Sequence, residues 1–431
     1  MQVEAWLTRA AQRAPDRLAV ATPQRAVSYR ELAALAGAGA RELGVAPGSR
    51  VAIALEPGLD FAVALHACLL AGAVAVPVDP RDPGGAPPCD AIVAAPLSCR
   101  GPALASVGHE LSATALIVRT SGTSGEPKEV PLTYGNFLWS AIGSAVALGS
   151  DPAERWLCAL PLVHVGGLSI VLRSAIYATT AVLHERFETQ AALDALTSER
   201  ITLVSVVATT LARLLDAGLT DPPSLRCALV GGGPAPAALL ERARDAGVTV
   251  SQTYGLTEAC SQVATQTPGE RGSDSGPPLF CTRVTLARDG EILVAGPTVS
   301  PAVAGGVLAT GDLGELDAQG RLRVIGRRAD TIITGGENVS PSEVEAVLER
   351  HPAVLEAGVY GVGDERWGEA VHAVVVARDA VSEAELRAHC AALLPRFKVP
   401  KRIAFAQQLS RTASGKLQRG RLAVDGGERT S

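Results

Sequence analysis

Residues 120–128 read Thr120-Ser121-Gly122-Thr123-Ser124-Gly125-Glu126-Pro127-Lys128. Glycine lets a backbone turn sharply and bring its N–H groups close to an anion. The serine and threonine hydroxyls of the stretch are further donors, and Lys128 adds a mobile positive charge. This composition predicts a phosphate-binding loop, with a plain surface loop as the alternative. A Walker motif is excluded, because neither Lys-Ser nor Lys-Thr follows Gly125 at the required spacing.

The runs around this loop predict a mixed α/β fold. Residues 115–119 are an apolar, β-prone run that leads directly into the loop. Similar runs occur at residues 51–55, 74–78, 156–160, 180–183, 203–207 and 225–230. They alternate with helical patterns, which predicts a parallel sheet covered by helices. Between Pro80 and Pro102 prolines and glycines are dense, so little regular structure is expected there.

The pattern changes after residue 280. Short apolar runs at 284–286, 291–294 and 322–325 are separated by turn signals, which predicts a small antiparallel barrel or sheet. After Gly326 a compact α+β module follows, with capping boxes predicted at Ser340–Glu343 and at Ser382–Glu385. We therefore expect an α/β protein with two domains. Residues 1–326 form a large N-terminal domain of helix-covered β-sheets plus a small β-barrel-like part, and residues 327–431 form a small α+β domain.

The composition limits the classes of function. The chain has 431 residues, 47% hydrophobic and 19% charged, which is enough for two or more domains. The net charge is −5 without a basic block, so no nucleic-acid partner is expected. The most apolar stretch, residues 61–77, falls short of a comfortable membrane span. The lack of a signal-peptide pattern, and eight cysteines without a CxxC pair, favour a cytoplasmic protein.

Six further segments combine glycines with hydroxyls, charges or an aromatic ring. They are residues 161–167 with His164, 231–234 with Gly231, Gly232 and Gly233, 252–258 with Tyr254, Thr257 and Glu258, 310–312 with Asp312, 326–338 with Arg327, Gly335 and Gly336, and 412–416 with Lys416. Each segment alone is a weak signal, because short motifs often match by chance. In this order, and from about Trp6 to Leu422, they resemble the adenylate-forming superfamily of acyl-CoA synthetases.

The resemblance implies an ATP-dependent enzyme that activates a small carboxylic acid as an acyl-adenylate. Two anions must meet at such a site, so it has to supply positive charge and N–H donors. The implied β- and γ-phosphate ligands are Thr120, Ser121, Gly122, Thr123, Ser124, Gly125 and Lys128. The implied ligands of the rest of the nucleotide are Gly231, Gly232 and Gly233 at adenine, Tyr254 stacking on the ring, Asp312 and Arg327 at the ribose, and Thr257 at the α-phosphate. Glu258 would bind Mg²⁺, which prefers carboxylate and phosphate oxygens.

The small domain has two implied tasks. Lys416 would neutralise the charge that develops on the acid and the bridging oxygen during adenylate formation. The domain would then rotate about a hinge near Ala329, exclude Lys416 and admit the thiol of coenzyme A. Gly335 and Gly336 would line the pantetheine tunnel, where missing side chains leave room. The C-terminal domain is therefore expected to be a mobile lid.

Three stretches, at residues 160–169, 173–177 and 257–263, are most similar to the o-succinylbenzoate–CoA ligase branch of the superfamily, which serves menaquinone biosynthesis. This implies that His164 lines the acyl pocket. It also implies that Arg173 supplies a cation for the second carboxylate of a dicarboxylic aromatic acid. The open alternative for Arg173 is a snorkelling side chain.

Two positions depart from the superfamily pattern. Glu129 follows Lys128 where relatives usually have Gly, and a carboxylate beside a phosphate site is unexpected unless it faces away. Ser410 stands where a Pro commonly precedes the lysine loop. Other functions also stay open: a different aryl- or acyl-CoA ligase, an enzyme that loads a carrier-protein thiol, and a catalytically silent nucleotide-binding relative. A homodimer is an open alternative for the assembly.

Overall fold

The computed structural model describes residues 1–81, 87–101, 108–121, 127–411 and 417–427. Its largest sheet has eight strands in the order β15-β14-β13-β12-β10-β11-β2-β3. The strands are β2 (Leu18–Ala21), β3 (Ala26–Ser28), β10 (Arg155–Cys158), β11 (Thr180–Leu183), β12 (Leu203–Val206), β13 (Cys227–Val230), β14 (Val250–Leu256) and β15 (Ser261–Thr265). From β14 to β2 every neighbouring pair is parallel, as the alternation of runs and helices predicts.

A second sheet has the order β6-β4-β5-β8-β9. Its strands are β4 (Arg50–Ile53), β5 (Val74–Pro77), β6 (Ala91–Val93), β8 (Thr114–Ser121) and β9 (Pro127–Thr133), and a separate pair joins β1 (Gln2–Val3) to β7 (His109–Glu110). The strand β6 lies in the stretch where little regular structure was expected. It is only three residues long and Ile92 is exposed, so its sequence signal is weak.

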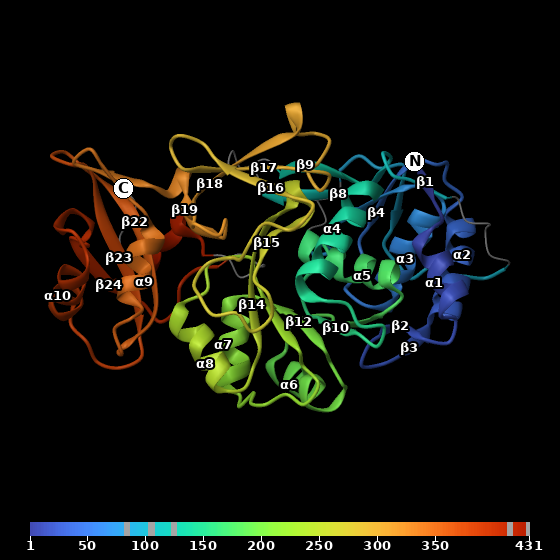
Figure 1. The fold of residues 1–431 in the computed structure, drawn as a ribbon, viewed down its shortest axis with the longest axis horizontal. Coiled ribbons are helices and arrows are strands. Elements are labelled where there is room, and N and C mark those ends of the chain that lie inside the picture. The colour runs from blue at the N-terminus through green and yellow to red at the C-terminus, as the bar shows by residue number, and fades with distance from the viewer. Residues whose placement is uncertain (82–86, 102–107, 122–126, 412–416, 428–431) are drawn as a thin grey trace.

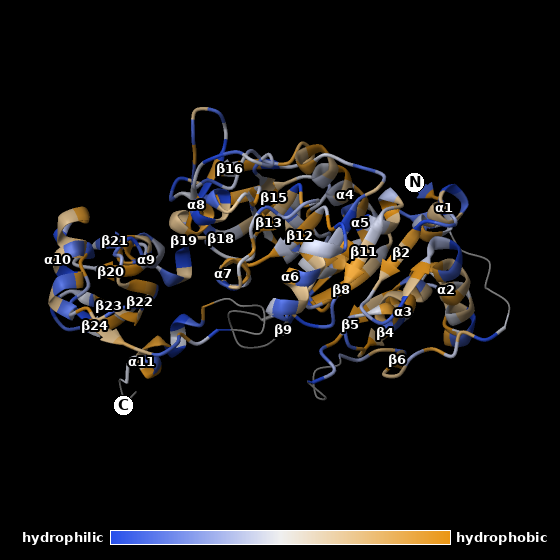
Figure 2. Ribbon diagram, turned by 90° about the horizontal axis from the view of Figure 1, so that it is seen from below, coloured by the Kyte–Doolittle hydropathy of each residue, from blue (hydrophilic) through white to orange (hydrophobic). Residues whose placement is uncertain are grey.

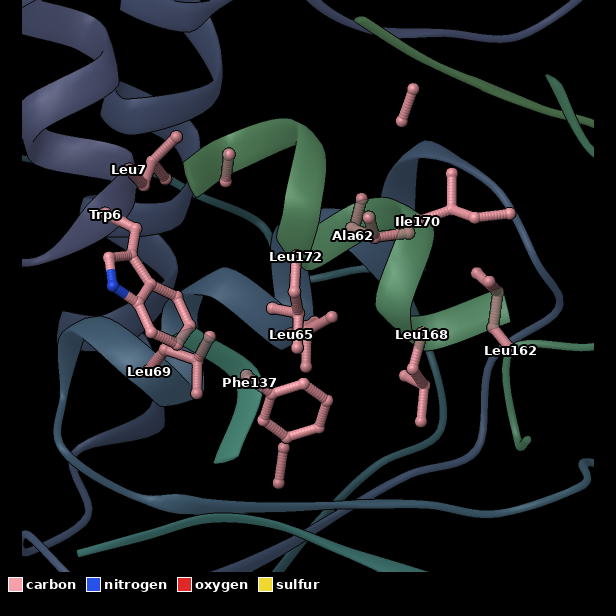
Figure 3. Packing of buried hydrophobic residues seen from close by; sticks show 14 of the residues in the cluster. Trp6, Leu7, Ala62, Leu65, Leu69, Phe137, Leu162, Leu168, Ile170 and Leu172 are labelled. Atoms are coloured by element: carbon pink, nitrogen blue, oxygen red, sulfur yellow. The ribbon is translucent and has the colours of Figure 1, made fainter. Parts of the chain in front are cut away.

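Helices cover both sheets (Figure 1), and helix and strand side chains together form the main buried apolar clusters. They are α1 (Trp6–Arg13), α2 (Tyr29–Leu43), α3 (Leu59–Leu70), α4 (Tyr134–Leu148), α5 (Val165–Tyr177), α6 (Thr189–Ser198), α7 (Ala208–Asp216) and α8 (Ala237–Asp245). In Figure 3, Leu65 and Leu69 of α3, Phe137 of α4 and Leu172 of α5 point toward one another. Each such side chain contributes about 1.5–3 kcal/mol when it is fully buried. Figure 2 shows the covered strands β2 and β11 as largely hydrophobic ribbons.

A four-stranded antiparallel sheet follows, in the order β16-β17-β18-β19. Its strands are β16 (Arg283–Leu286), β17 (Glu291–Ala295), β18 (Val307–Leu316) and β19 (Leu322–Arg327), with the short 3-10 helices η1 (Thr257–Ala259) and η2 (Ala304–Gly306) before and within it. The antiparallel sheet was predicted, and residues 310–312 lie inside β18, a strand that the sequence runs did not mark. Gly311, at φ +73°, interrupts the apolar alternation there, which hides the strand in the sequence.

The C-terminal part is a smaller α+β unit at the end of the molecule opposite α2 (Figure 1). Its elements are η3 (Arg328–Asp330), β20 (Ile332–Thr334), β21 (Glu337–Val339), α9 (Pro341–Leu348), β22 (Val354–Asp364), β23 (Gly368–Ala377), α10 (Glu383–Leu393), η4 (Arg396–Lys398), β24 (Arg402–Phe405), η5 (Arg419–Arg421) and α11 (Leu422–Asp425). The division into residues 1–326 and 327–431 stays a prediction. Within the described residues, no helix combines the length and the apolar character needed to cross a membrane.

One of the two predicted capping boxes is wrong. Pro341 is the first residue of α9 as expected, but the Ser340 hydroxyl makes no cap and donates instead to the Ile325 carbonyl at 2.9 Å. The Glu343 carboxylate pairs instead with Lys398, whose ammonium donates to both carboxylate oxygens. At α10 the Ser382 hydroxyl accepts from the Glu385 N–H at 3.2 Å, so the predicted N-cap is confirmed, but only this one of the two reciprocal bonds of a capping box is recorded. Long-range partners therefore outcompete the local cap at α9.

Candidate active site

The predicted phosphate loop connects two neighbouring strands that pair with one another. Strands β8 and β9 are antiparallel, with Thr120 opposite Lys128 and Ser121 opposite Pro127. Gly122, Thr123, Ser124 and Gly125 lie outside the described residues. Unlike a Walker loop, this loop leads into a strand and not into a helix, so a helix dipole is not available to the anion. Positive charge at the loop must come from side chains such as Lys128, which is exposed.

Glu129 is directed away from the phosphate loop. Successive side chains of a strand point to opposite faces, so Lys128 and Glu129 diverge. The Arg50 guanidinium, on β4, donates to Glu129 at 2.5 Å, and this bond raises the pKa of Arg50. The acidic departure from the superfamily pattern is therefore neutralised within the sheet.

The three glycines predicted at adenine lie at the carboxyl end of β13. Gly231 packs so closely on β14 that a Cβ would come within 2.7 Å of the Thr253 side chain. Gly232 has φ +80°, and a Cβ on Gly233 would meet nothing within 4 Å. Ligands of open α/β sheets bind outside the carboxyl ends of the strands, at this edge. The glycines leave a backbone surface that a planar ring can approach.

Tyr254, Asp312 and Arg327 form one hydrogen-bonded group. The Tyr254 hydroxyl donates to Asp312 Oδ2 at 2.7 Å, and Arg327 Nε donates to Asp312 Oδ1 at 3.1 Å. Burial and the adjacent Asp312 carboxylate raise the pKa of Tyr254, so the hydroxyl keeps its proton. A carboxylate offers about four lone-pair sites, and two are used here. The remaining sites suit the two hydroxyls of a ribose.

Thr257 and Glu258 lie in η1, the tight connection between β14 and β15. Both side chains are partly buried, and the Ser300 N–H donates to the Glu258 carbonyl at 2.8 Å. Among the described residues, no three His, Cys, Asp or Glu side chains gather as a metal site. A single carboxylate fits Mg²⁺ that is shared with phosphate oxygens and water, because Mg²⁺ is usually bound through one or two carboxylates.

His164 and Arg173 lie at different depths of α5. His164 is the N-cap residue and partly buried, next to Gly167, where a Cβ would come within 2.7 Å of the Pro161 carbonyl. Arg173 comes nine residues later, about 13 Å along the helix axis. It is 3% exposed, so the snorkelling alternative is wrong.

The Arg173 guanidinium is an isolated buried charge. Nη2 donates to the Ser140 hydroxyl at 2.9 Å, and the group lies over the Trp156 ring at 5.8 Å. Its Nε has no hydrogen-bond partner among the described residues, and no described carboxylate pairs with it. Burial lowers the pKa of Arg173. An uncompensated buried charge is costly, so an anionic partner would be favourable here.

The hinge segment is bound on both sides of Ala329. Arg328 donates to Asp289 at 2.8 Å and to Glu291 at 3.1 Å, both in or next to β17. Asp330 instead accepts from Arg419 at 3.1 Å, in the C-terminal unit. Ala329 itself is exposed. The one residue between these two attachments is the residue predicted as the hinge.

Lys416 and the rest of residues 412–416 lie outside the described residues, but the flanks of this segment are fixed. Ser410 donates its N–H at 2.8 Å and its hydroxyl at 2.7 Å to the Asp425 carboxylate. The Arg411 side chain pairs with Glu356, and the Arg411 backbone forms an isolated antiparallel β-bridge with Leu417 at the other end of the segment. A proline at 410 could not make the N–H bond. This chain therefore replaces a rigid residue with two bonds to one carboxylate.

Gly335 and Gly336 form the turn between β20 and β21. Both have positive φ, +60° and +83°. A Cβ on Gly335 would come within 2.9 Å of the Trp367 ring, whereas one on Gly336 would meet nothing within 4 Å. Gly335 is thus needed for packing, and Gly336 leaves an open backbone surface.

Sequence patterns missed several residues that hold this site. Asn136, Ser140, Ser300, Arg328 and Arg419 act through partners distant in the chain, so no local motif reveals these contacts. Only the Thr133–Asn136 reciprocal cap at the start of α4 left a local signal.

A glycine-lined strand edge with a carboxylate for a ribose places the chain among α/β enzymes that bind nucleotides. Comparison with family models is more specific. Residues 7–86 and 102–308 match the AMP-binding enzyme model, and residues 343–416 match the AMP-binding enzyme C-terminal domain. The chain belongs to the AMP-binding enzyme family.

Curated relatives match along almost the whole chain. The 2-succinylbenzoate–CoA ligase of Bacillus subtilis (strain 168) is 38% identical over 474 residues, covering 97% of each chain. The 2-succinylbenzoate–CoA ligase of Geobacillus kaustophilus is 39% identical over 475 residues, covering 97% of this chain and 96% of its own length.

Solved structures add information on domain arrangement. The Bacillus subtilis o-succinylbenzoate CoA synthetase with the acyl-adenylate OSB-AMP superposes with a TM-score of 0.90, at 37% identity and 98% coverage of both chains. A double mutant of that enzyme with a product analogue, OSB-NCoA, gives 0.72 at the same identity and coverage. Because the double mutant and the adenylate-bound enzyme differ at only two residues, the lower score reflects a different three-dimensional arrangement of the same protein. The present structure resembles the adenylate-bound arrangement more closely.

Proposed function

We propose that this chain is an ATP-dependent 2-succinylbenzoate–CoA ligase. The acid's carboxylate attacks the α-phosphorus of ATP, pyrophosphate leaves, and the thiol of coenzyme A then displaces AMP from the acyl-adenylate. The observation that carries the proposal is the match over 98% of both chains to an enzyme holding such an adenylate. A place in menaquinone biosynthesis belongs to the same proposal.

The proposed nucleotide roles follow the geometry. Asp312, held by Tyr254 and Arg327, accepts the ribose hydroxyls, while Gly231–Gly233 present backbone to adenine. Stacking of the Tyr254 ring on adenine is part of this proposal. The phosphate loop, with Thr120 and Lys128 at its base, binds the β- and γ-phosphates. Thr257 binds the α-phosphate, and Glu258 binds Mg²⁺.

The proposed acid site lies between α5 and η1. His164 lines the pocket for the aromatic acid. Arg173 compensates the second carboxylate, and its unpaired buried charge supports this role. Lys416 stabilises the charge that develops during adenylate formation. Rotation about Ala329 then replaces Lys416 with the backbone at Gly335 and Gly336, beside which the thiol enters.

The test is an exchange assay with purified full-length protein. We expect labelled pyrophosphate to exchange into ATP only with Mg²⁺ and 2-succinylbenzoate, and CoA to give the thioester. Exchange with another aryl or acyl acid, but not this one, would support a different CoA ligase. Transfer to a carrier-protein thiol in place of CoA would indicate a loading enzyme. No exchange with a broad acid panel would indicate a silent nucleotide-binding relative.

Two coarser properties complete the proposal. A homodimer is the assembly to test, by light scattering of the full chain. A cytoplasmic location is supported by the eight cysteines, all free in the structure.

A further inference from the structure

The turn that carries Thr257 and Glu258 has an unfavourable backbone. Strands β14 and β15 pair as far as Leu256 opposite Ser261, so residues 257–260 are a tight connection. Cys260 has φ +53° and ψ +50°, and Ser261 has φ +90°. Residues other than glycine rarely adopt such left-handed conformations, and they persist only where surrounding contacts enforce them.

Helix α4 supplies the enforcing contact. The Ser140 hydroxyl donates to the Cys260 carbonyl at 2.7 Å, and both residues are buried. The hydroxyl also accepts from Arg173 at 2.9 Å. A hydroxyl that accepts from a cation is polarised and becomes a stronger donor. The buried charge of Arg173 thus strengthens the bond that holds the Cys260 carbonyl.

The same face of α4 also holds the other side of the turn. Asn136, one helical turn before Ser140, donates to the Pro297 carbonyl at 2.8 Å and to the Val299 carbonyl at 3.0 Å. The next residue, Ser300, donates its N–H to the Glu258 carbonyl. The turn is therefore clamped from both sides by one helix.

We propose that Ser140 is a positioning residue for Thr257 and Glu258, acting through the left-handed turn at Cys260. In this role it acts through its bond to the Cys260 carbonyl and not by contact with the nucleotide or the acid. Its hydroxyl fixes the backbone from which the α-phosphate donor and the metal-binding carboxylate project. This inference rests on the proposed function for the meaning of those two side chains, but its geometry is independent of the acid.

Ser140→Ala is the primary variant, and Ser144→Ala is the matched control. Ser144 is equally buried one turn further along α4, and it does not bond the turn among the described residues. We expect Ser140→Ala to raise the Mg²⁺ concentration for half-maximal pyrophosphate release at least tenfold and to lower kcat more than it raises the KM of the acid. Ser144→Ala should change both less than twofold. Ser140→Cys introduces a weaker donor of similar size, so its effects should lie between those of Ser140→Ala and Ser144→Ala. It serves as the test variant if Ser140→Ala does not fold.

Cys260→Gly provides a rescue that tests the route of the effect. Glycine adopts the left-handed conformation without help, so Ser140→Ala should cost much less in a Cys260→Gly background than in the native chain. The inference would be overturned if Ser140→Ala lowered activity equally in the native and the Cys260→Gly backgrounds. It would also be overturned if Ser140→Ala and Ser140→Cys required no more Mg²⁺ than Ser144→Ala. If the native protein does not release pyrophosphate with any of the acids tested, the proposed function fails. Calorimetric binding of ATP with and without Mg²⁺ then tests Ser140 separately.

Discussion

Arg328 and Asp330 are two residues apart but are bound to different parts of the molecule. Arg328 pairs with Asp289 and Glu291 beside the four-stranded sheet, whereas Asp330 pairs with Arg419 in the C-terminal unit. A rotation at Ala329 would leave all of these pairs intact. The hinge near Ala329 stays a prediction, and these pairs name the contacts that a test of it should preserve.

The two arginines should differ strongly in their effect on stability. Arg419 binds Glu345, which is only 7% exposed, so Arg419→Ala leaves a buried carboxylate without its partner and should cost about 3–5 kcal/mol of unfolding free energy. Arg328 is 55% exposed, so Arg328→Ala should cost less than about 1 kcal/mol. Urea unfolding measures both. Similar losses would contradict the assignment of Arg419 as the buried link.

The lysine of the 412–416 segment should act in one half-reaction only. We expect Lys416→Ala to lower adenylate formation by about a hundred- to a thousandfold, as removal of one transition-state donor does. ATP binding, and thioester formation from pre-made acyl-adenylate, should be retained. Arg421→Ala, an exposed cation nearby, is the control. Loss of all three properties together would make Lys416 a structural residue.

Arg173 should discriminate between acids. If its unpaired charge receives the second carboxylate, Arg173→Met should reduce kcat/KM for 2-succinylbenzoate far more than for benzoate. Loss of a charge-assisted bond of about 1.5–3 kcal/mol corresponds to roughly a ten- to hundredfold difference. Ser144→Ala provides the contrast, because Ser144 does not bond Arg173 among the described residues and its loss should affect both acids equally. Equal losses for Arg173→Met would leave that residue only its bond to Ser140.

The C-terminal unit should lose stability as the pH rises. Burial and the nearby Glu345 carboxylate together raise the pKa of Glu349 to about 7, against the opposing effects of the Ala357 N–H and Arg411. Between its unfolded value of 4.5 and about 7, the folded state holds a proton that the unfolded state has released. Stability therefore falls through this window, by about 3 kcal/mol in total.

Glu349→Gln removes this titration. The variant should match the native protein near pH 4.5 and become the more stable of the two by pH 8, as thermal or denaturant unfolding would record. The Ala357 N–H that Glu349 accepts can still be satisfied by the Gln oxygen. A difference that is constant with pH would show that Glu349 does not carry the proton.

Local patterns predicted the elements and the order of the motifs. The run at residues 115–119 and the parallel runs from 156 to 230 became β8 and β10–β13, because buried strands need apolar residues whatever their neighbours are. Two of the glycines at 231–233 have a structural reason that a sequence pattern can mark, because a Cβ on Gly231 would clash with Thr253 and Gly232 has φ +80°.

Long-range pairing was beyond these patterns. Ser340 carries every local feature of a cap but bonds Ile325. Ser140 looks like any helix serine, and its partner at Cys260 is 120 residues away. Such choices depend on which groups the completed fold leaves unpaired, and that information is distributed over the whole chain.

The pairing of Ser410 with Asp425 has an evolutionary consequence. Ser410 gives the Asp425 carboxylate two hydrogen-bond donors, its N–H and its hydroxyl. A proline at position 410 has neither donor, so Asp425 would lose both bonds. Relatives with proline at position 410 should therefore more often lack the acid at position 425, and we expect the two positions to covary. Ancestral reconstruction along this lineage should find them changing on the same branch.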